Sequence, residues 1–279
     1  MITTLQTVVI LGICLFIGIL IFFKIPYSKL NSHFNQSIEN YRKKSEKNPT
    51  FFNENDLAKL PPPVKQYFVH CGYIGKPKMA SMKVSCTNVD FRMENKLLTI
   101  DYMLYSFLDK PARFAFIKTS LFGIPFQGLD SYEDGLGGMK GVLGKLVTLF
   151  NQGGEKMDQA CLATFLSECL VFPNAALQKY ITWEEIDSFH AKATIFFNGL
   201  SASGIFTFDE NGLVRYFETD DRYISNSDGS MTALKWTALF SNYVENDGIL
   251  QPKEIQAAWN YPDKDVVYFS SSNALIEFQ

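Results

Sequence analysis

An uninterrupted apolar run near the N-terminus, Val8–Phe23, constrains this chain more than any other feature of its sequence. With its flanking residues, the run approaches the roughly 20 residues that an α-helix needs to cross about 30 Å of hydrocarbon. No later stretch of the chain is as long and as apolar. The run therefore predicts one transmembrane helix within residues 1–26 and a remainder that folds outside the membrane.

The flanks of the run indicate an uncleaved signal anchor. No Lys or Arg precedes it, and Phe22–Pro26 lacks the small residues of a signal-peptidase site. We therefore expect Val8–Phe23 to stay in contact with membrane lipid. Lys24 and Lys29 follow the span, so the positive-inside rule favours a cytoplasmic domain. The charges of Arg42–Lys47 add to this preference unless they form a solvated helix face, and the side of the membrane is left open.

The segment after the run, residues 27–56, predicts a juxtamembrane amphipathic helix over Ser28–Lys47. The apolar residues that recur there at helical spacing are Leu30, Phe34, Ile38 and Tyr41. Their stripe either lies on lipid, with the basic end of the helix on anionic headgroups, or packs against the domain of the same chain. The spacing alone does not decide between the two.

Residues 57–279 predict one mainly β (α+β) domain. Beyond residue 79 the apolar period changes to two, and later aromatic and β-branched runs alternate with the turn signals Asp209–Gly212, Asn226–Gly229 and Asn246–Gly248. One helix, Met157–Leu170, interrupts the strands. We expect a long antiparallel meander that forms a curved, half-barrel-like sheet with a crossing helix.

Composition excludes several classes of function. The net charge is −3, and no stripe of Lys and Arg interleaved with aromatic residues follows the linker, so we expect no nucleic-acid partner. The 5 Cys show no CxxC motif, and the 3 His stand far apart. Neither a metal site nor a cofactor site is therefore predicted, and the thiols are interpreted as buried and free.

The glycine-rich segment Asp134–Lys145 is the nearest approach to a phosphate-binding loop. A Walker loop that ends at Lys145 needs glycine where Met139 stands and Ser or Thr where Leu146 stands. No strand–loop–helix unit surrounds it. We therefore interpret the segment as a turn and a strand.

Two charged residues fall at positions that the pattern predicts to be buried. Glu168 shares part of the apolar face of the predicted helix, and Arg222 ends a predicted strand. An unpaired internal charge costs several kcal/mol, so we expect the two to pair or to share a polar network, with Asp134 as a further member. This network is predicted to be structural, with contact to a ligand as the alternative.

Several motifs together resemble a bacterial, membrane-anchored family of domains of unknown function. They are Leu60-Pro-Pro-Pro-Val64, Tyr132–Met139, Phe165–Pro173 and Phe208–Leu213. The resemblance spans about residues 57–279 and implies a single-pass protein of a bacterial cytoplasmic membrane, without implying an activity. The strand-rich layout is similar to the lipoprotein-carrier half-barrels of bacterial envelopes, which is a likeness of fold only.

The leading hypothesis is non-catalytic binding of an apolar or amphipathic ligand, such as a lipid, on the concave face of the sheet. The aromatic residues expected to line that face are Tyr102, Phe126, Phe165, Phe196, Phe206, Trp236 and Trp259. An apolar cavity of roughly 300 Å³ or more favours this hypothesis. A filled core favours the alternative, a scaffold or accessory protein that docks a membrane partner. A cleft that gathers Glu168, Arg222 and Asp134 favours an enzyme with an unfamiliar site.

Overall fold

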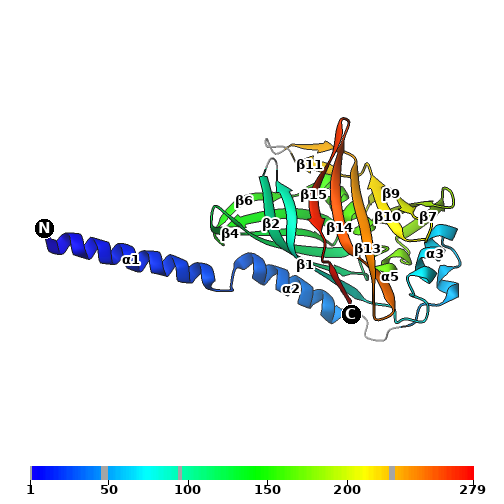
Figure 1. Ribbon diagram of the computed structural model, residues 1–279, viewed down its shortest axis with the longest axis horizontal. Helices are drawn as coiled ribbons and strands as arrows, with labels where there is room; N and C mark the ends of the chain where they lie inside the picture. Colours follow the sequence, from blue (N-terminus) through cyan, green and yellow to red (C-terminus); the bar gives the residue numbers. More distant parts are fainter. Residues whose placement is uncertain (1, 45–49, 94–95, 226–229) are drawn as a thin grey trace.

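The computed structural model describes residues 2–44, 50–93, 96–225 and 230–279, and it begins with two helices (Figure 1). Helix α1 (Ile2–Lys24) projects away from the domain, and helix α2 (Lys29–Lys44) lies along it. In the described part of the chain, one helical stretch, which begins at Gln6, is long and apolar enough to cross a membrane, with a mean hydropathy of 2.9. None of that apolar stretch is buried against the domain.

One antiparallel sheet of 14 strands dominates the domain. Its first half is β1 (Ser81–Met93), β2 (Lys96–Phe107), β3 (Ala112–Leu121), β4 (Ile124–Glu133), β5 (Leu136–Leu143) and β6 (Val147–Gln152). Its second half is β7 (Ile181–Glu185), β8 (His190–Phe197), β9 (Leu200–Phe208), β10 (Val214–Thr219), β13 (Trp236–Asn246), β14 (Ile249–Tyr261), β15 (Lys264–Ser271) and β16 (Leu275–Phe278). A separate pair, β11 (Tyr223–Ser225) and β12 (Met231–Ala233), flanks the predicted turn Asn226–Gly229, which lies outside the described residues.

The two halves meet where the end of the chain returns to its beginning. The order across the sheet is β6-β5-β4-β3-β2-β1-β15-β14-β13-β10-β9-β8-β7, and β16 also pairs with β1. Asp90 of β1 stands opposite Ser270 of β15. Neighbours on each side of this seam are antiparallel and mostly consecutive, and the sheet curves without closing (Figure 1). The predicted fold class, a long antiparallel meander with a crossing helix, is confirmed.

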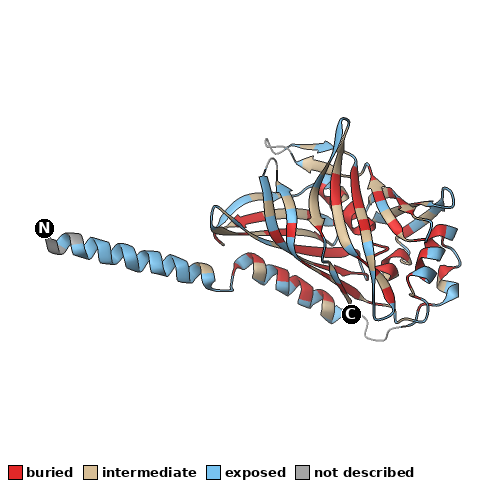
Figure 2. Ribbon diagram, in the orientation of Figure 1, coloured by how far each residue is buried: buried red, intermediate tan, exposed pale blue. Residues whose placement is uncertain are grey.

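The main core fills the inside of the curve, between the sheet and four short helical elements (Figure 2). These are η1 (Glu54–Leu57), α3 (Pro62–His70), α4 (Glu155–Ser167) and α5 (Pro173–Ala176). Helix α4 approaches β5 closely because Gly137 has no side chain, and a Cβ there would lie 2.5 Å from the Met157 carbonyl oxygen. The Gly137 amide donates to Asp158 Oδ1 at 2.6 Å, which fixes the start of the helix on the strand.

Helix α2 covers the opposite, convex face of the sheet. Its buried apolar residues, Leu30, Phe34, Ile38 and Tyr41, pack in a second core against β2, β3, β4 and β5. The Phe34 ring lies 5.0 Å from that of Phe116, and Ser28 donates to Gln127 Oε1 at 2.6 Å. Of the two placements that the sequence left open, the structure shows packing on the chain's own domain.

Candidate functional site

The aromatic residues predicted to line the concave face fall into different environments. Phe165, Phe206 and Trp236 are packed inside the core, and Phe126 is buried against Phe150. Phe196 is 62% exposed, because it follows the buried Ile195 in strand β8 and its side chain therefore points to the other face. For Phe196, the prediction of a concave-face position is wrong.

Tyr102 and Trp259 are the two predicted residues that remain half-buried. Tyr102 borders an interior cavity of about 70 Å³, which apolar side chains of β1, β2 and β13–β15 enclose together with Glu168. Ligand pockets usually measure about 300–1,000 Å³. The cavity is therefore too small for an acyl chain unless the surrounding elements move.

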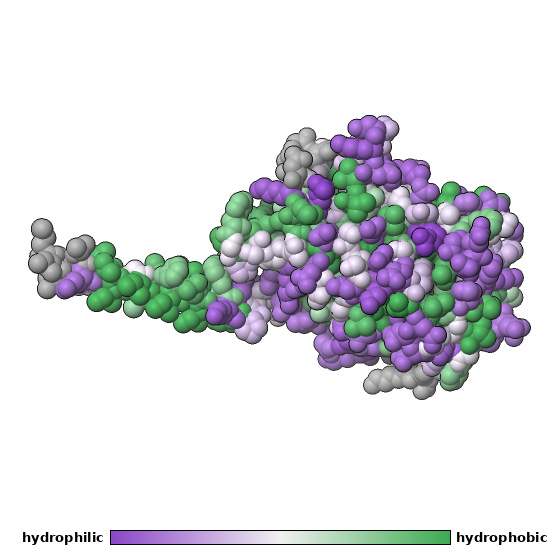
Figure 3. Space-filling model, in the orientation of Figure 1, coloured by the Kyte–Doolittle hydropathy of each residue, from purple (hydrophilic) through white to green (hydrophobic). Residues whose placement is uncertain are grey.

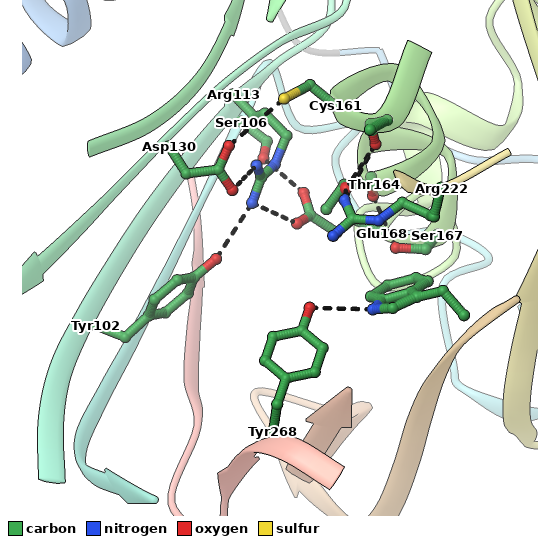
Figure 4. A network of polar contacts seen from close by, with 12 residues as sticks. Tyr102, Ser106, Arg113, Asp130, Cys161, Thr164, Ser167, Glu168, Arg222 and Tyr268 are labelled. Atoms are coloured by element: carbon green, nitrogen blue, oxygen red, sulfur yellow. Dashed lines mark hydrogen bonds and ion pairs between the residues drawn. The ribbon is translucent and has the colours of Figure 1, made fainter. Parts of the chain in front are cut away.

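A buried ion-pair network crosses the concave face beside the C-terminal end of α4 (Figure 4). At its centre lies Arg113, which is 1% exposed although it belongs to a strand of apolar neighbours. Arg113 Nη1 donates to Asp130 Oδ2 at 2.7 Å, and Nη2 lies 3.2 Å from Glu168 Oε1 and 3.3 Å from the Tyr102 hydroxyl. Ser106 donates to the second Glu168 oxygen at 3.3 Å. The guanidinium thus compensates two carboxyl groups that the fold removes from water.

The electrostatics of this network favour structural pairing. Burial raises the pKa of Glu168, while the Arg113 guanidinium opposes the rise. Burial lowers the pKa of Arg113, but the carboxylates of Asp130 and Glu168 outweigh it, so the net shift is upward. Burial also raises the pKa of the Cys161 thiol, and the Asp130 carboxylate adds to that rise. Cys161 is therefore held as a thiol rather than as a reactive thiolate.

Arg222 lies near Glu168 beside α4, but it has hydrogen-bond partners of its own (Figure 4). It donates to the Ala160 carbonyl at 3.1 Å and to the Thr164 hydroxyl. Its guanidinium carbon stands 4.7 Å from the Trp236 ring centre and 5.5 Å from that of Trp259. Cation–π contacts, the Ala160 carbonyl and the Thr164 hydroxyl therefore stabilise Arg222, whereas the ion pair of Glu168 is made with Arg113.

Asp134 stands apart from this buried network, which corrects the prediction that it would be a member. It occupies the exposed turn between β4 and β5 and pairs with Lys110 at 2.8 Å. Its φ of 50° explains the position, since Asp tolerates the left-handed conformation that such a turn requires. Glu168, Arg222 and Asp134, which would favour an enzyme if they met in one cleft, are therefore not gathered in one cleft.

Among the described residues, no cluster of His, Cys, Asp and Glu could hold a metal ion.

A larger depression lies on the convex face, between the first turns of α2 and the strands β4 to β6. This groove, which we call the α2 groove, has a volume of about 370 Å³. Lys29, His33, Lys140 and Lys145 stand along it. No Asp or Glu is among the described residues that line it. The charged or titratable side chains that line the groove are therefore all basic.

The floor of the α2 groove is apolar, and one end of the groove adjoins α1. Leu30, Leu129 and Val142 form the floor. Lys145 donates to the carbonyl of Phe22 at 2.8 Å and to that of Ile25. These carbonyls are acceptors left unpaired at the end of a helix, where a cation is favoured. The lysine thus ties the groove to the point where the apolar helix ends.

Sequence reasoning missed the residues that define both sites. Arg113 carried a usable signal, because it is a lone charge in the otherwise apolar run Ala112–Ile117. Lys140 belongs to the glycine-rich segment Asp134–Lys145, which the sequence predicts to be a turn and a strand and which forms β5 and the turn to β6. His33 is one of the 3 His, whose wide separation in the sequence predicts no shared site. No local pattern marks these residues as neighbours.

The fold and the sites define an open, half-barrel-like antiparallel β domain with an apolar helix before it. The chain belongs to DUF6544, a family of unknown function, whose model matches residues 50–271. This confirms the expected membership of a family of domains of unknown function, and no activity comes with it. A comparison with curated proteins finds no match.

Comparison with solved structures finds distant similarities of fold. A LolA superfamily protein from Nitrosomonas europaea is 11% identical, with 77% of this chain and 93% of that chain covered at a TM-score of 0.39. A putative outer membrane lipoprotein-sorting protein domain from Vibrio parahaemolyticus is 12% identical, with 71% and 84% covered at a TM-score of 0.37. A DUF1329 family protein from Desulfovibrio piger is 12% identical, with 78% and 94% covered at a TM-score of 0.32. At these TM-scores no ligand is inferred from the likeness.

Proposed function

We propose that this chain is a membrane-tethered β domain that binds an anionic amphipathic lipid, without catalysis, in the α2 groove. One observation carries the proposal: a groove of about 370 Å³ combines a rim of Lys and His with an apolar floor and adjoins the end of α1. An anionic headgroup pairs with the rim, and the first methylene groups of its acyl chains cover the floor. Both halves of an amphipathic molecule are thus recognised.

The charge of the rim supports an anionic ligand. Lys29 and Lys140 both line the groove, one from α2 and the other from β5. Each basic residue near an anionic membrane surface contributes about 1 kcal/mol to binding. The α2 groove is also preorganised, because the buried face of α2 holds that helix in place without the ligand.

The location of the domain is part of the proposal. Helix α1 spans the membrane as an uncleaved anchor, and Lys24 and Lys29 after the span favour the cytoplasmic side. A ligand on the concave face, which the sequence predicted, is less favoured because the interior cavity of about 70 Å³ would have to expand several-fold. A reporter fused after Gln279 that is active on one side of the membrane only tests the orientation.

Native mass spectrometry of the full chain tests the site. The detergent-extracted protein is titrated with phosphatidylglycerol and with phosphatidylcholine of the same acyl chains. We expect tighter binding of phosphatidylglycerol, reduced about tenfold or more in Lys29→Glu/Lys140→Glu. Lys264→Glu, a charge reversal at the distant β14–β15 turn, should leave it unchanged. Equal binding of both lipids, or equal loss in the double variant and the control, would refute the proposal.

A second candidate is the scaffold or accessory protein, favoured by the tightly filled interior. In that case the folded protein retains neither lipid, and a membrane partner co-purifies with it. The same titration therefore separates the two candidates.

A further inference from the structure

The end of the domain next to α1 exposes large apolar side chains at the turns of two hairpins. Phe122, in the β3–β4 turn, is 89% exposed. Leu146 and Val147, in and after the β5–β6 turn, are 75% and 58% exposed. Figure 1 shows both turns beside the place where α1 meets the domain, and Figure 3 shows hydrophobic residues gathered at that end.

Phe122 is an unfavourable residue for the turn that it occupies. Its φ is 54° and that of Gly123 is 77°, the left-handed pair of a two-residue hairpin turn. Three other described turns place Asp134, Asn198 and Asp247 before glycine in the same conformation, which is the favoured chemistry. A phenylalanine there is strained and buries almost nothing within the chain. Strain of this kind points to a role outside folding.

The β5–β6 turn is fixed to the last turn of α1. Lys145 donates to Phe22 and Ile25, its ammonium lies 5.3 Å from the Phe22 ring centre, and a Cβ on Gly144 would lie 3.4 Å from the Phe23 ring. The apolar run of α1 ends at the same residues. If α1 spans a bilayer, as proposed above, this turn lies at the level of the headgroups.

Basic residues accompany the exposed apolar residues at this end of the domain. The Lys96 ammonium stands 4.9 Å from the Phe122 ring centre. Lys24 ends α1, and Lys29 begins α2. Apolar side chains with basic neighbours match the acyl boundary and the anionic headgroups of a bilayer surface.

We propose that this hairpin end docks on the lipid bilayer, with Phe122, Leu146 and Val147 inserted at the acyl boundary. The occupant is the bilayer itself, because α1 delivers these turns to its surface. Docking holds the domain upright on the membrane instead of letting it swing on the segment between α1 and α2. It also places the mouth of the α2 groove, which Leu146 lines, at the headgroup layer, so that a lipid can enter from the side.

Depth-dependent fluorescence quenching of the full chain in nanodiscs tests the docking. An environment-sensitive dye is attached to Phe122→Cys, or to Leu136→Cys as control, with Cys14 replaced by Ala. Leu136, which is 67% exposed, begins β5 just after the turn at the other end of β4, and the remaining cysteines are buried. We expect doxyl-labelled lipid to quench the dye at position 122 several-fold more than at position 136.

A second variant separates docking from folding. Phe122→Asn relieves the turn, so its melting temperature should equal or exceed that of the wild type. A dye at Leu146→Cys should nevertheless be quenched less by doxyl lipid in this variant. Equal quenching at positions 122 and 136 overturns the docking proposal. A dye at position 122 that is shielded from water but not quenched by doxyl lipid also overturns it, because a second copy of the chain or another protein then covers the turn. Phosphatidylglycerol binding that persists in detergent would then leave the proposed groove function standing.

Discussion

Replacing Phe34 by Ala should release helix α2 from the sheet. Phe34 is 2% exposed, with its ring 5.0 Å from that of Phe116 and 6.0 Å from that of Tyr105. A Phe side chain buries about 150–250 Å², worth about 4–6 kcal/mol at 25 cal/mol per Å² as an upper bound. Measured Phe→Ala substitutions in cores cost about 3–5 kcal/mol. We therefore expect Phe34→Ala to lower the free energy of undocking α2 from the sheet by about 3 kcal/mol.

Hydrogen exchange measures this quantity directly. An isolated helix as short as α2 is marginal in water, so its amides exchange whenever it undocks. A loss of about 3 kcal/mol predicts exchange about 10² times faster in Phe34→Ala, since 1.4 kcal/mol corresponds to a factor of ten. The amides of the β13–β14 hairpin, remote from α2, should keep their rates.

Asn35→Ala is the matched control, because Asn35 is exposed on the same helix. Alanine favours a helix over asparagine, so this variant should exchange no faster than the wild type. If the amides of α2 exchange at the same rate in Phe34→Ala and Asn35→Ala, packing of Phe34 on the sheet does not hold the helix in place. The argument for a preorganised α2 groove would then also fail, because Lys29 and His33 stand on that helix.

Three further predictions concern the interior. Burial raises the pKa of the Cys71 thiol to about 12. At pH 8 about one molecule in 10⁴ therefore carries the reactive thiolate. Mass spectrometry should accordingly detect alkylation of the domain's buried cysteines only after urea has unfolded the protein. Gly137→Ala should destabilise the fold by about 1–3 kcal/mol through overpacking against α4, whereas Gly138→Ala, whose Cβ would have its nearest neighbour at 3.6 Å, should shift the melting temperature less. The pKa of Glu168 is raised in the folded protein, so protonation of this carboxyl group stabilises the native state. This contribution to the free energy of unfolding is complete below the unfolded pKa of about 4.3, and it is lost as the pH rises through the folded pKa. Urea titrations should therefore show the wild type losing stability relative to Glu168→Gln as the pH rises above about 4.3, and a pH-independent difference would contradict this sign.

Local patterns predicted the elements of this chain well where one physical period dominates. The apolar run became α1, the spacing of Leu30 and Phe34 became α2, and the period of two became the strands of the meander. The crossing helix begins at Glu155 and ends at Ser167, so Glu168 lies at its C-terminal cap rather than within it. End effects of this kind depend on capping geometry, which the spacing of apolar residues does not encode.

The sites depended on contacts that no local pattern contains. Arg113 meets Glu168 because of the place where α4 crosses the concave face, and Arg222 contacts the Ala160 carbonyl, the Thr164 hydroxyl and two indole rings beside the same helix. The expectation that Glu168 and Arg222 pair or share a polar network rested on the predicted burial of both charges. Charge type shows that a buried group needs a partner, whereas only packing selects which partner lies within reach.

The sequence by itself determined an apolar helix, an amphipathic helix and a meander of strands, because hydrophobic periodicity acts over a few neighbouring residues. Only the tertiary structure decided that Lys29 and Lys140, more than a hundred positions apart, line one groove. Successive strand residues point to opposite faces, so the role of Lys140 depended on which face α2 would cover. That choice followed from the curvature of the whole sheet, whose concave side α4 already fills.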